Sequence, residues 1–132
     1  MKLYNVLHNI VKRFGIDYVV ETGTFGGWTY CKWASGKSEC WGTLTQNVTS
    51  WTAWGSIYEG KPTVQGTYPS GVFNVTPKCW AFPDGINGAG ILGIESYTGA
   101  SKTTTPYLYA LRPTSGNAFT VPIYVYALGT WK

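Results

Sequence analysis

The chain has 132 residues, of which 17% are Phe, Trp or Tyr and only 12% are Asp, Glu, Lys or Arg. This length fits one domain, and a composition that is 44% hydrophobic and rich in Tyr, Trp, Thr, Val and Gly excludes both a disordered chain and a long helical protein. The net charge of +4 comes from basic residues that are scattered singly apart from Lys12–Arg13, so we expect no nucleic-acid partner.

Residues 1–15 differ from the rest of the chain and predict a short N-terminal helix. Leu3, Leu7, Ile10 and Phe14 are spaced 4, 3 and 4 apart, as in the seam of a coiled coil, and Gly15 supplies a helix stop. A helix this short is not stable alone in water. It therefore either packs on its own domain or assembles with copies of itself as an oligomerisation neck.

From residue 16 onward the hydrophobic pattern changes to period two, and turn residues separate the apolar runs. Such a rhythm predicts an all-β fold, an antiparallel β-sandwich of about 8–10 short strands over residues 16–132. Residues 46–67 are marked by Trp51, Trp54 and Tyr58 without a defined strand. Strands are expected over residues 16–22, 28–34, 37–45, 72–75, 78–82, 91–97, 107–112 and 121–128.

A tight hairpin turn is expected at residues 35–36, where it would place Lys32 opposite Glu39 and Cys31 opposite Cys40. Directly opposed cysteines lie within disulfide range. An odd number of cysteines and the absence of a secretory signal favour free thiols instead, and a three-residue turn with a bulge would take this pair out of register. In the two-residue register, one face carries Trp28, Tyr30 and Trp41, and the other carries Cys31, Trp33 and Cys40.

Residues for catalysis or metal binding are scarce. His8, the only histidine, lies in the predicted helix, so nucleophilic triads have no base, and no C-x-x-C pair suggests zinc. The six carboxylates share no motif, and no nucleotide-binding fingerprint is present. No apolar run reaches the length of a membrane span. We therefore expect no enzymatic activity, no cofactor, no metal site and no membrane insertion.

Seven Trp and ten Tyr exceed what one modest core would bury, so some rings are expected to form interfaces or ligand platforms. The best-placed ones lie in a Thr/Ser-rich connection and around the loop at residues 83–88. A flat ring beside Asp or Asn acceptors suits a sugar ligand, whereas the alternative for each ring is the core or a subunit interface. The receptor-binding candidates are Trp51, Trp54, Trp80, Phe82, Asp84 and Asn87.

Three segments carry a family resemblance: residues 16–24 (IDYVVETGT), residues 27–42 (GWTYCKWASGKSECWG) and residues 125–132 (VYALGTWK). Together they resemble the C-terminal tip domain of tail-fibre, baseplate or minor structural proteins of phages and prophages of Gram-positive, often gut, bacteria. The hairpin motif Trp-Thr-Tyr-x-Lys-Trp-x-Ser-Gly is the most specific part, while residues 46–105 match in rhythm only. Cys31 departs from the pattern, because the family usually carries Arg at this position.

The resemblance implies a β-sandwich at the distal end of a homotrimeric fibre, behind a short coiled neck that would use the seam from Leu3 to Phe14. It implies a virion protein that is released by lysis, contacts other tail proteins and binds a host cell-surface polysaccharide or protein. It transfers no binding residues, since the receptor-facing loops of such domains vary. A monomeric bacterial carbohydrate-binding module, a purely structural fibre segment and a glycan depolymerase stay open as alternatives.

Overall fold

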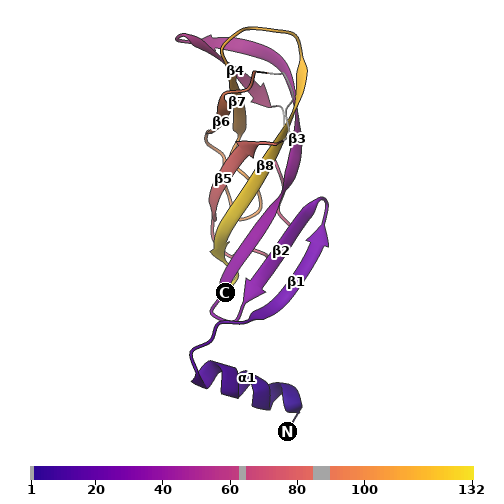
Figure 1. Ribbon diagram of the computed structural model, residues 1–132, viewed down its shortest axis with the longest axis vertical. Coiled ribbons are helices and arrows are strands. Elements are labelled where there is room, and N and C mark those ends of the chain that lie inside the picture. Colours follow the sequence, from indigo (N-terminus) through magenta and orange to yellow (C-terminus); the bar gives the residue numbers. More distant parts are fainter. Residues whose placement is uncertain (1, 63–64, 85–89) are drawn as a thin grey trace.

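The computed structural model describes residues 2–62, 65–84 and 90–132 and shows an elongated molecule with a helix at one end (Figure 1). Antiparallel strands make up most of the described chain, which confirms the expected all-β class. The elements are α1 (Leu3–Arg13), β1 (Val19–Phe25), β2 (Trp28–Trp33), β3 (Lys37–Trp54), β4 (Ile57–Pro62), β5 (Lys78–Pro83), β6 (Gly93–Ser96), β7 (Leu108–Arg112) and β8 (Phe119–Thr130).

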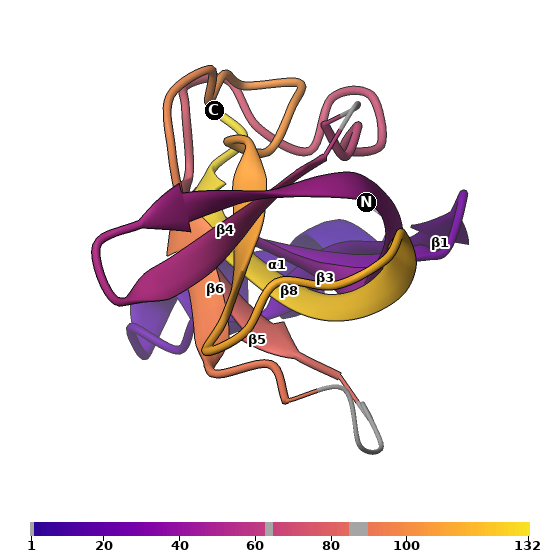
Figure 2. The ribbon, with the colours of Figure 1, turned by 90° about the horizontal axis from the view of Figure 1, so that it is seen from above.

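Within the described residues, all eight strands belong to one sheet, whose order is β1-β2-β3-β4-β7-β6 with β8 pairing both β3 and β5. The 18-residue strand β3 is shared by two arms. The lower arm is β1-β2-β3-β8-β5, and the upper arm is the last part of β3 with β4, β7 and β6. Seen from above, the sheet curls into a half-barrel (Figure 2), so the expected sandwich is not confirmed.

The strand expected over residues 16–22 is shifted to 19–25, and two other segments differ from expectation more strongly. Residues 46–62, where no defined strand was expected, hold the second half of β3 and all of β4. Residues 72–75 were expected to form a strand, but they form an irregular, bent segment after a turn at Gly71, whose φ is +73°. The reason is that Val72 and Phe73 are fully or almost fully buried, so they fill the core from a loop rather than pair with a neighbour.

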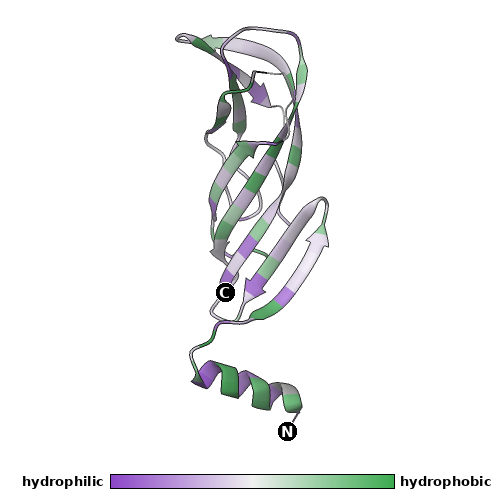
Figure 3. Cartoon of the chain, viewed as in Figure 1, coloured by the Kyte–Doolittle hydropathy of each residue, from purple (hydrophilic) through white to green (hydrophobic). Residues whose placement is uncertain are grey.

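The core lies on the inner face of the curl. Along β8, inward Val121, Ile123, Val125 and Ala127 are all buried, and this alternation appears as bands of hydropathy on the strand (Figure 3). Residues 65–77 cross this face and add Tyr68, Val72 and Phe73 to it. The remaining buried apolar side chains come from β2, β3 and β7 and are Trp28, Cys40, Val48, Leu108 and Ala110.

The register of the β2–β3 hairpin is shifted by one residue from the expected one, because its connection has three residues, 34–36, rather than two. Lys32 lies opposite Ser38, and Tyr30 lies opposite Cys40. The Gly36 N–H donates to the Trp33 carbonyl at 3.0 Å, and Gly36 takes a φ of +99°, the geometry of a three-residue loop with a glycine bulge.

Because side chains alternate along a strand, this one-residue shift changes which side chains of β2 and β3 lie on the same face of the sheet. Cys40 points into the core, whereas Cys31 lies opposite Glu39 on the outer face, so the Cys31–Cys40 pairing considered above is wrong and all three cysteines are free. The expected Lys32–Glu39 pair is also wrong. Lys32 instead forms a 3.0 Å ion pair with Glu21 of β1.

Helix α1 lies beyond the lower end of the sheet (Figure 1). Tyr18 reaches back to it, and the Tyr18 hydroxyl hydrogen-bonds the His8 ring. The four expected seam residues, Leu3, Leu7, Ile10 and Phe14, are all exposed, so the lower arm of the same chain does not cover them. No helix of the described part of the chain has the length and apolar character to cross a membrane.

Candidate functional site

Aromatic side chains gather on the outer face of the lower arm, opposite the core. Strand pairing places Trp80, Tyr126 and Trp41 in one row across β5, β8 and β3. Phe82 and Tyr124 form the next row, which Thr43 of β3 completes. We call this set the outer platform: Trp41, Thr43, Trp80, Phe82, Tyr124 and Tyr126, with Asp84 at its edge.

The rings of the outer platform point away from the core, because side chains alternate along each strand and the residues between them point inward. Phe82 is 55% exposed, Trp80 45% and Tyr124 37%. The Trp80 and Tyr126 rings lie 5.9 Å apart between centroids and are tilted by 41°. Adjacent exposed rings on a sheet are typical of an interaction surface, since covering their apolar faces with a ligand or partner removes them from water and is favourable.

Asp84 fixes one polar edge of the outer platform. Its backbone N–H donates to the Pro122 carbonyl at 2.9 Å, which ties the residue after β5 to β8. Its side chain reaches over β8 to β3, where Thr43 Oγ1 donates to Asp84 Oδ2 at 2.6 Å. The hydroxyl and the carboxylate therefore lie beside the row of Phe82 and Tyr124.

Glu39 borders the other side of the outer platform and holds two rings in place. The Tyr126 hydroxyl donates to Glu39 Oε1 at 2.7 Å, and the Trp33 indole N–H donates to Oε2 at 3.0 Å. Partial burial raises the pKa of Glu39, but these hydrogen bonds and nearby Lys37 outweigh it and place the pKa below its ordinary value. Burial and the bond to Glu39 raise the pKa of Tyr126 to about 12, so its hydroxyl stays a donor at neutral pH.

The structure brings three of the six receptor-binding candidates together: Trp80, Phe82 and Asp84 all belong to the outer platform. Trp51 instead packs against the core, and its indole N–H donates to the Asn117 carbonyl at 3.0 Å. Trp54 is exposed, but it lies at the tip of the β3–β4 hairpin, at the end of the molecule far from α1 (Figure 1). Asn87 lies outside the described residues.

Trp41, Tyr124, Tyr126 and Thr43 were not among the candidates. Strict alternation along residues 121–128 was a usable signal for the two tyrosines, because it places them opposite the apolar positions of β8. Trp41 could not be found this way. Its face depends on the hairpin register, which the two-residue turn predicted incorrectly.

The carboxylates of the lower arm are engaged in structural contacts. Ser35 donates to both oxygens of Asp17, and Tyr30 and Lys32 both donate to Glu21. Among the described residues, no group of three or more His, Cys, Asp or Glu side chains could hold a metal ion. The outer platform combines stacking surfaces with fixed hydrogen-bonding groups, which is chemistry suited to binding.

Comparisons with family models, with curated proteins and with solved structures find no match for this chain.

Proposed function

We propose that this chain is the receptor-binding tip domain of a tail fibre, baseplate or minor structural protein of a phage or prophage that infects Gram-positive, gut-type bacteria. It binds a host cell-surface glycan without cleaving it and works as a homotrimer within the virion. The observation that carries the binding proposal is the outer platform, in which exposed rings of β5 and β8 lie beside the Asp84–Thr43 pair.

This geometry suits a carbohydrate for two reasons. The apolar C–H face of a sugar ring can stack on Trp80 or Phe82, which are flat, exposed and supported by neighbouring strands. Sugar hydroxyls can donate to the Asp84 carboxylate, whose oxygens accept more than one hydrogen bond each. The rings need little reorganisation on binding because strand pairing already orders their backbone, and this preorganisation favours affinity.

The fibre context is supported by the motif residues of the hairpin and by α1. The seam of α1 is exposed in the single chain, as a neck that assembles with copies of itself requires. We take the curled sheet and the segments that cover its inner face as the layers of the sandwich-like tip domain that the resemblance implies. The virion location and release by lysis follow from the same proposal.

The experiment is a glycan array of bacterial surface polysaccharides probed with the full chain, followed by calorimetry on the best ligand. Trp80→Ala and Phe82→Ala should each weaken binding about tenfold or more, since each removes an exposed stacking ring of the outer platform. Trp54→Ala is the matched control, because Trp54 is 51% exposed but lies far from the outer platform. It should bind like the unmodified chain.

Other results would select the alternatives. Loss of binding in Trp54→Ala but not in Trp80→Ala would move the receptor site to the β3–β4 tip. Binding by a monomer with undiminished affinity would favour a carbohydrate-binding module, and a trimer that binds no glycan and adsorbs to no cell would favour a structural fibre segment. Shortening of the polysaccharide by the purified chain would indicate a depolymerase.

A further inference from the structure

A second exposed surface lies at the α1 end. It consists mainly of apolar side chains, whereas the outer platform combines aromatic rings with polar groups. Leu3 is 81% exposed, Phe14 is 74% exposed, and Leu7 and Ile10 between them are also exposed. Exposure of apolar side chains continues through Ile16 in the connection after α1. It then extends onto β1 at Val19 and Val20. A continuous apolar strip of this kind is uncommon on a monomer in water.

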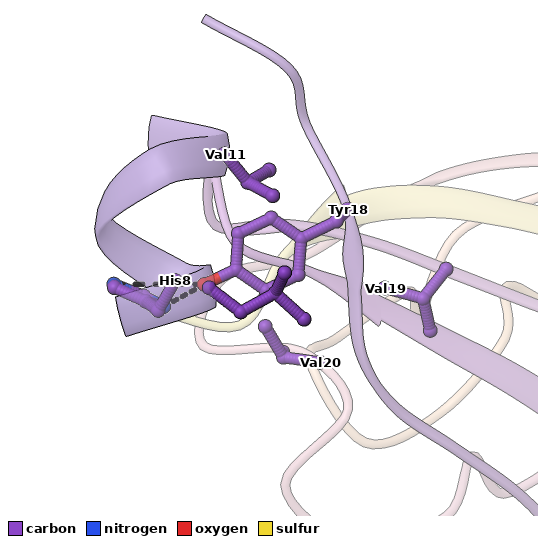
Figure 4. A pocket seen from close by; sticks show the side chains of 6 residues that line it. His8, Val11, Tyr18, Val19 and Val20 are labelled. Atoms are coloured by element: carbon purple, nitrogen blue, oxygen red, sulfur yellow. Dashed lines mark hydrogen bonds between the residues drawn. The ribbon is translucent and has the colours of Figure 1, made fainter. Parts of the chain in front are cut away.

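A cleft of about 300 Å³ separates α1 from β1 and is part of this strip. Figure 4 shows His8 and Val11 on the helix side of the cleft and Tyr18, Val19 and Val20 on the side of β1, with the Tyr18 ring reaching across toward His8. Leu7 also lines it, so this side chain belongs both to the cleft and to the helical seam. The His8–Tyr18 hydrogen bond joins α1 to the residue before β1 and so ties the two sides of the cleft together.

Strand β1 is also an edge of the sheet, because among the strands that the structure describes it pairs with β2 alone. Edge strands are normally protected from further pairing by charges, proline or a cover. The one charged residue of β1, Glu21, is engaged by Lys32 and Tyr30 on β2. The register of β1 shifts between Val19 and Glu21, which marks an irregularity at Val20 beside the cleft.

We propose that a second copy of this chain packs on the α1–β1 surface, with the apolar face of its helix against the cleft formed by Leu7, Val19 and Val20. A copy of the chain is the partner that this surface fits, because Leu7 belongs both to the cleft and to a seam with heptad spacing, and such a seam packs against another of the same kind. The basic residues Lys12 and Arg13 lie off this face on a helix of 3.6 residues per turn, so the approach is not repulsive. The inference rests on the assembly part of the proposed function and adds β1 to the interface.

The test measures the oligomeric state of the full chain and its variants by analytical ultracentrifugation. Leu7→Asp, Val19→Asp and Val20→Asp should each raise the dissociation constant of the assembly about tenfold or more, since each places a charge in an apolar interface. Leu92→Asp is the control, because Leu92 is similarly exposed next to β6 and far from α1 in the sequence and the fold. It should assemble like the unmodified chain. Thermal unfolding of each variant identifies any that is merely unfolded.

The outcomes separate this inference from the proposed function. If Leu7→Asp dissociates the assembly while both folded β1 variants leave it intact, β1 is not part of the interface and the inference is wrong, although a helical neck stands. If the unmodified chain is a monomer, the assembly part of the proposed function fails together with the inference. Glycan binding by the outer platform is measured separately and depends on Trp80, not on Leu7.

Discussion

Trp131, near the C-terminal end of the chain, packs on the β2–β3 hairpin and binds its turn. Its indole N–H donates to the Trp33 carbonyl at 2.9 Å, and its backbone N–H donates to the Gly36 carbonyl at 2.9 Å. The ammonium of Lys32, itself largely buried, lies 5.6 Å from the Trp131 ring centroid. The β2–β3 hairpin and the C-terminal end of the chain therefore contact each other, and these contacts stabilise the lower arm.

We predict that Trp131→Ala lowers the free energy of unfolding by about 2 kcal/mol, because it removes a partly buried ring and a hydrogen bond to the hairpin. Trp131→Phe keeps most of the ring and should cost about 1 kcal/mol. Trp54→Ala, at an exposed hairpin tip, should change stability by less than about 0.5 kcal/mol. Urea unfolding followed by fluorescence measures all three, and equal losses for Trp131→Ala and Trp54→Ala would contradict the stabilising role of Trp131.

In the β2–β3 hairpin, one additional turn residue changes which side chains of β2 and β3 share a face of the sheet. With a connection at residues 34–36, Cys40 is fully buried and Cys31 lies on the other face, opposite Glu39. Burial raises the pKa of Cys40 to about 12, so its thiol does not form a thiolate at neutral pH. The same shift turns Trp41 outward and makes it part of the outer platform.

The hairpin register predicts that the folded protein holds no disulfide between Cys31 and Cys40. Three thiols per chain should react with a thiol reagent after unfolding without reductant, and Cys40 should be the slowest of them in the folded protein. Addition of reductant should leave the Tm unchanged. Peptide mass spectrometry under non-reducing conditions would contradict the register if it found these two cysteines linked.

At the scale of the whole molecule, two surfaces with different chemistry lie apart. The exposed apolar strip is at the α1 end, whereas the outer platform covers the strands above it (Figure 1). Between them, three carboxylates tie the strands and turns of the lower arm together: Asp17 to the hairpin turn, Glu21 to β2, and Glu39 to β8. The single curled sheet thus leaves both surfaces accessible in the chain at the same time.

These carboxylates predict a loss of stability in acid. Hydrogen bonds from Ser35 hold the pKa of Asp17 below its ordinary 3.8, and those from Lys32 and Tyr30 hold the pKa of Glu21 below 4.5. A group whose pKa is lower in the folded state stabilises the fold fully above its ordinary pKa, and that contribution disappears as the pH falls through the folded value. The Tm should therefore be level near neutral pH and fall below about pH 4.5.

Differential scanning calorimetry between about pH 3 and pH 7 checks this profile. Glu21→Gln is the informative variant, because the amide keeps the shape of the side chain but cannot titrate. It should lower the Tm near neutral pH and make the acid decline shallower. A Tm that is independent of pH in the unmodified chain would show that these three contacts contribute nothing to stability.

The amino-acid sequence alone determined the all-β class and the N-terminal helix with its apolar seam, and it singled out Trp80, Phe82 and Asp84, which the structure places on one surface. Local information suffices for these features, since period-two alternation, heptad spacing and turn residues act over a few neighbours. The sequence did not determine the single curled sheet, the buried position of Trp51, or the place of Trp41 beside Tyr126. Those depend on how β3 pairs with β8, which lies more than 70 residues further along the chain, and on a one-residue difference in a turn, and only the tertiary structure decides both.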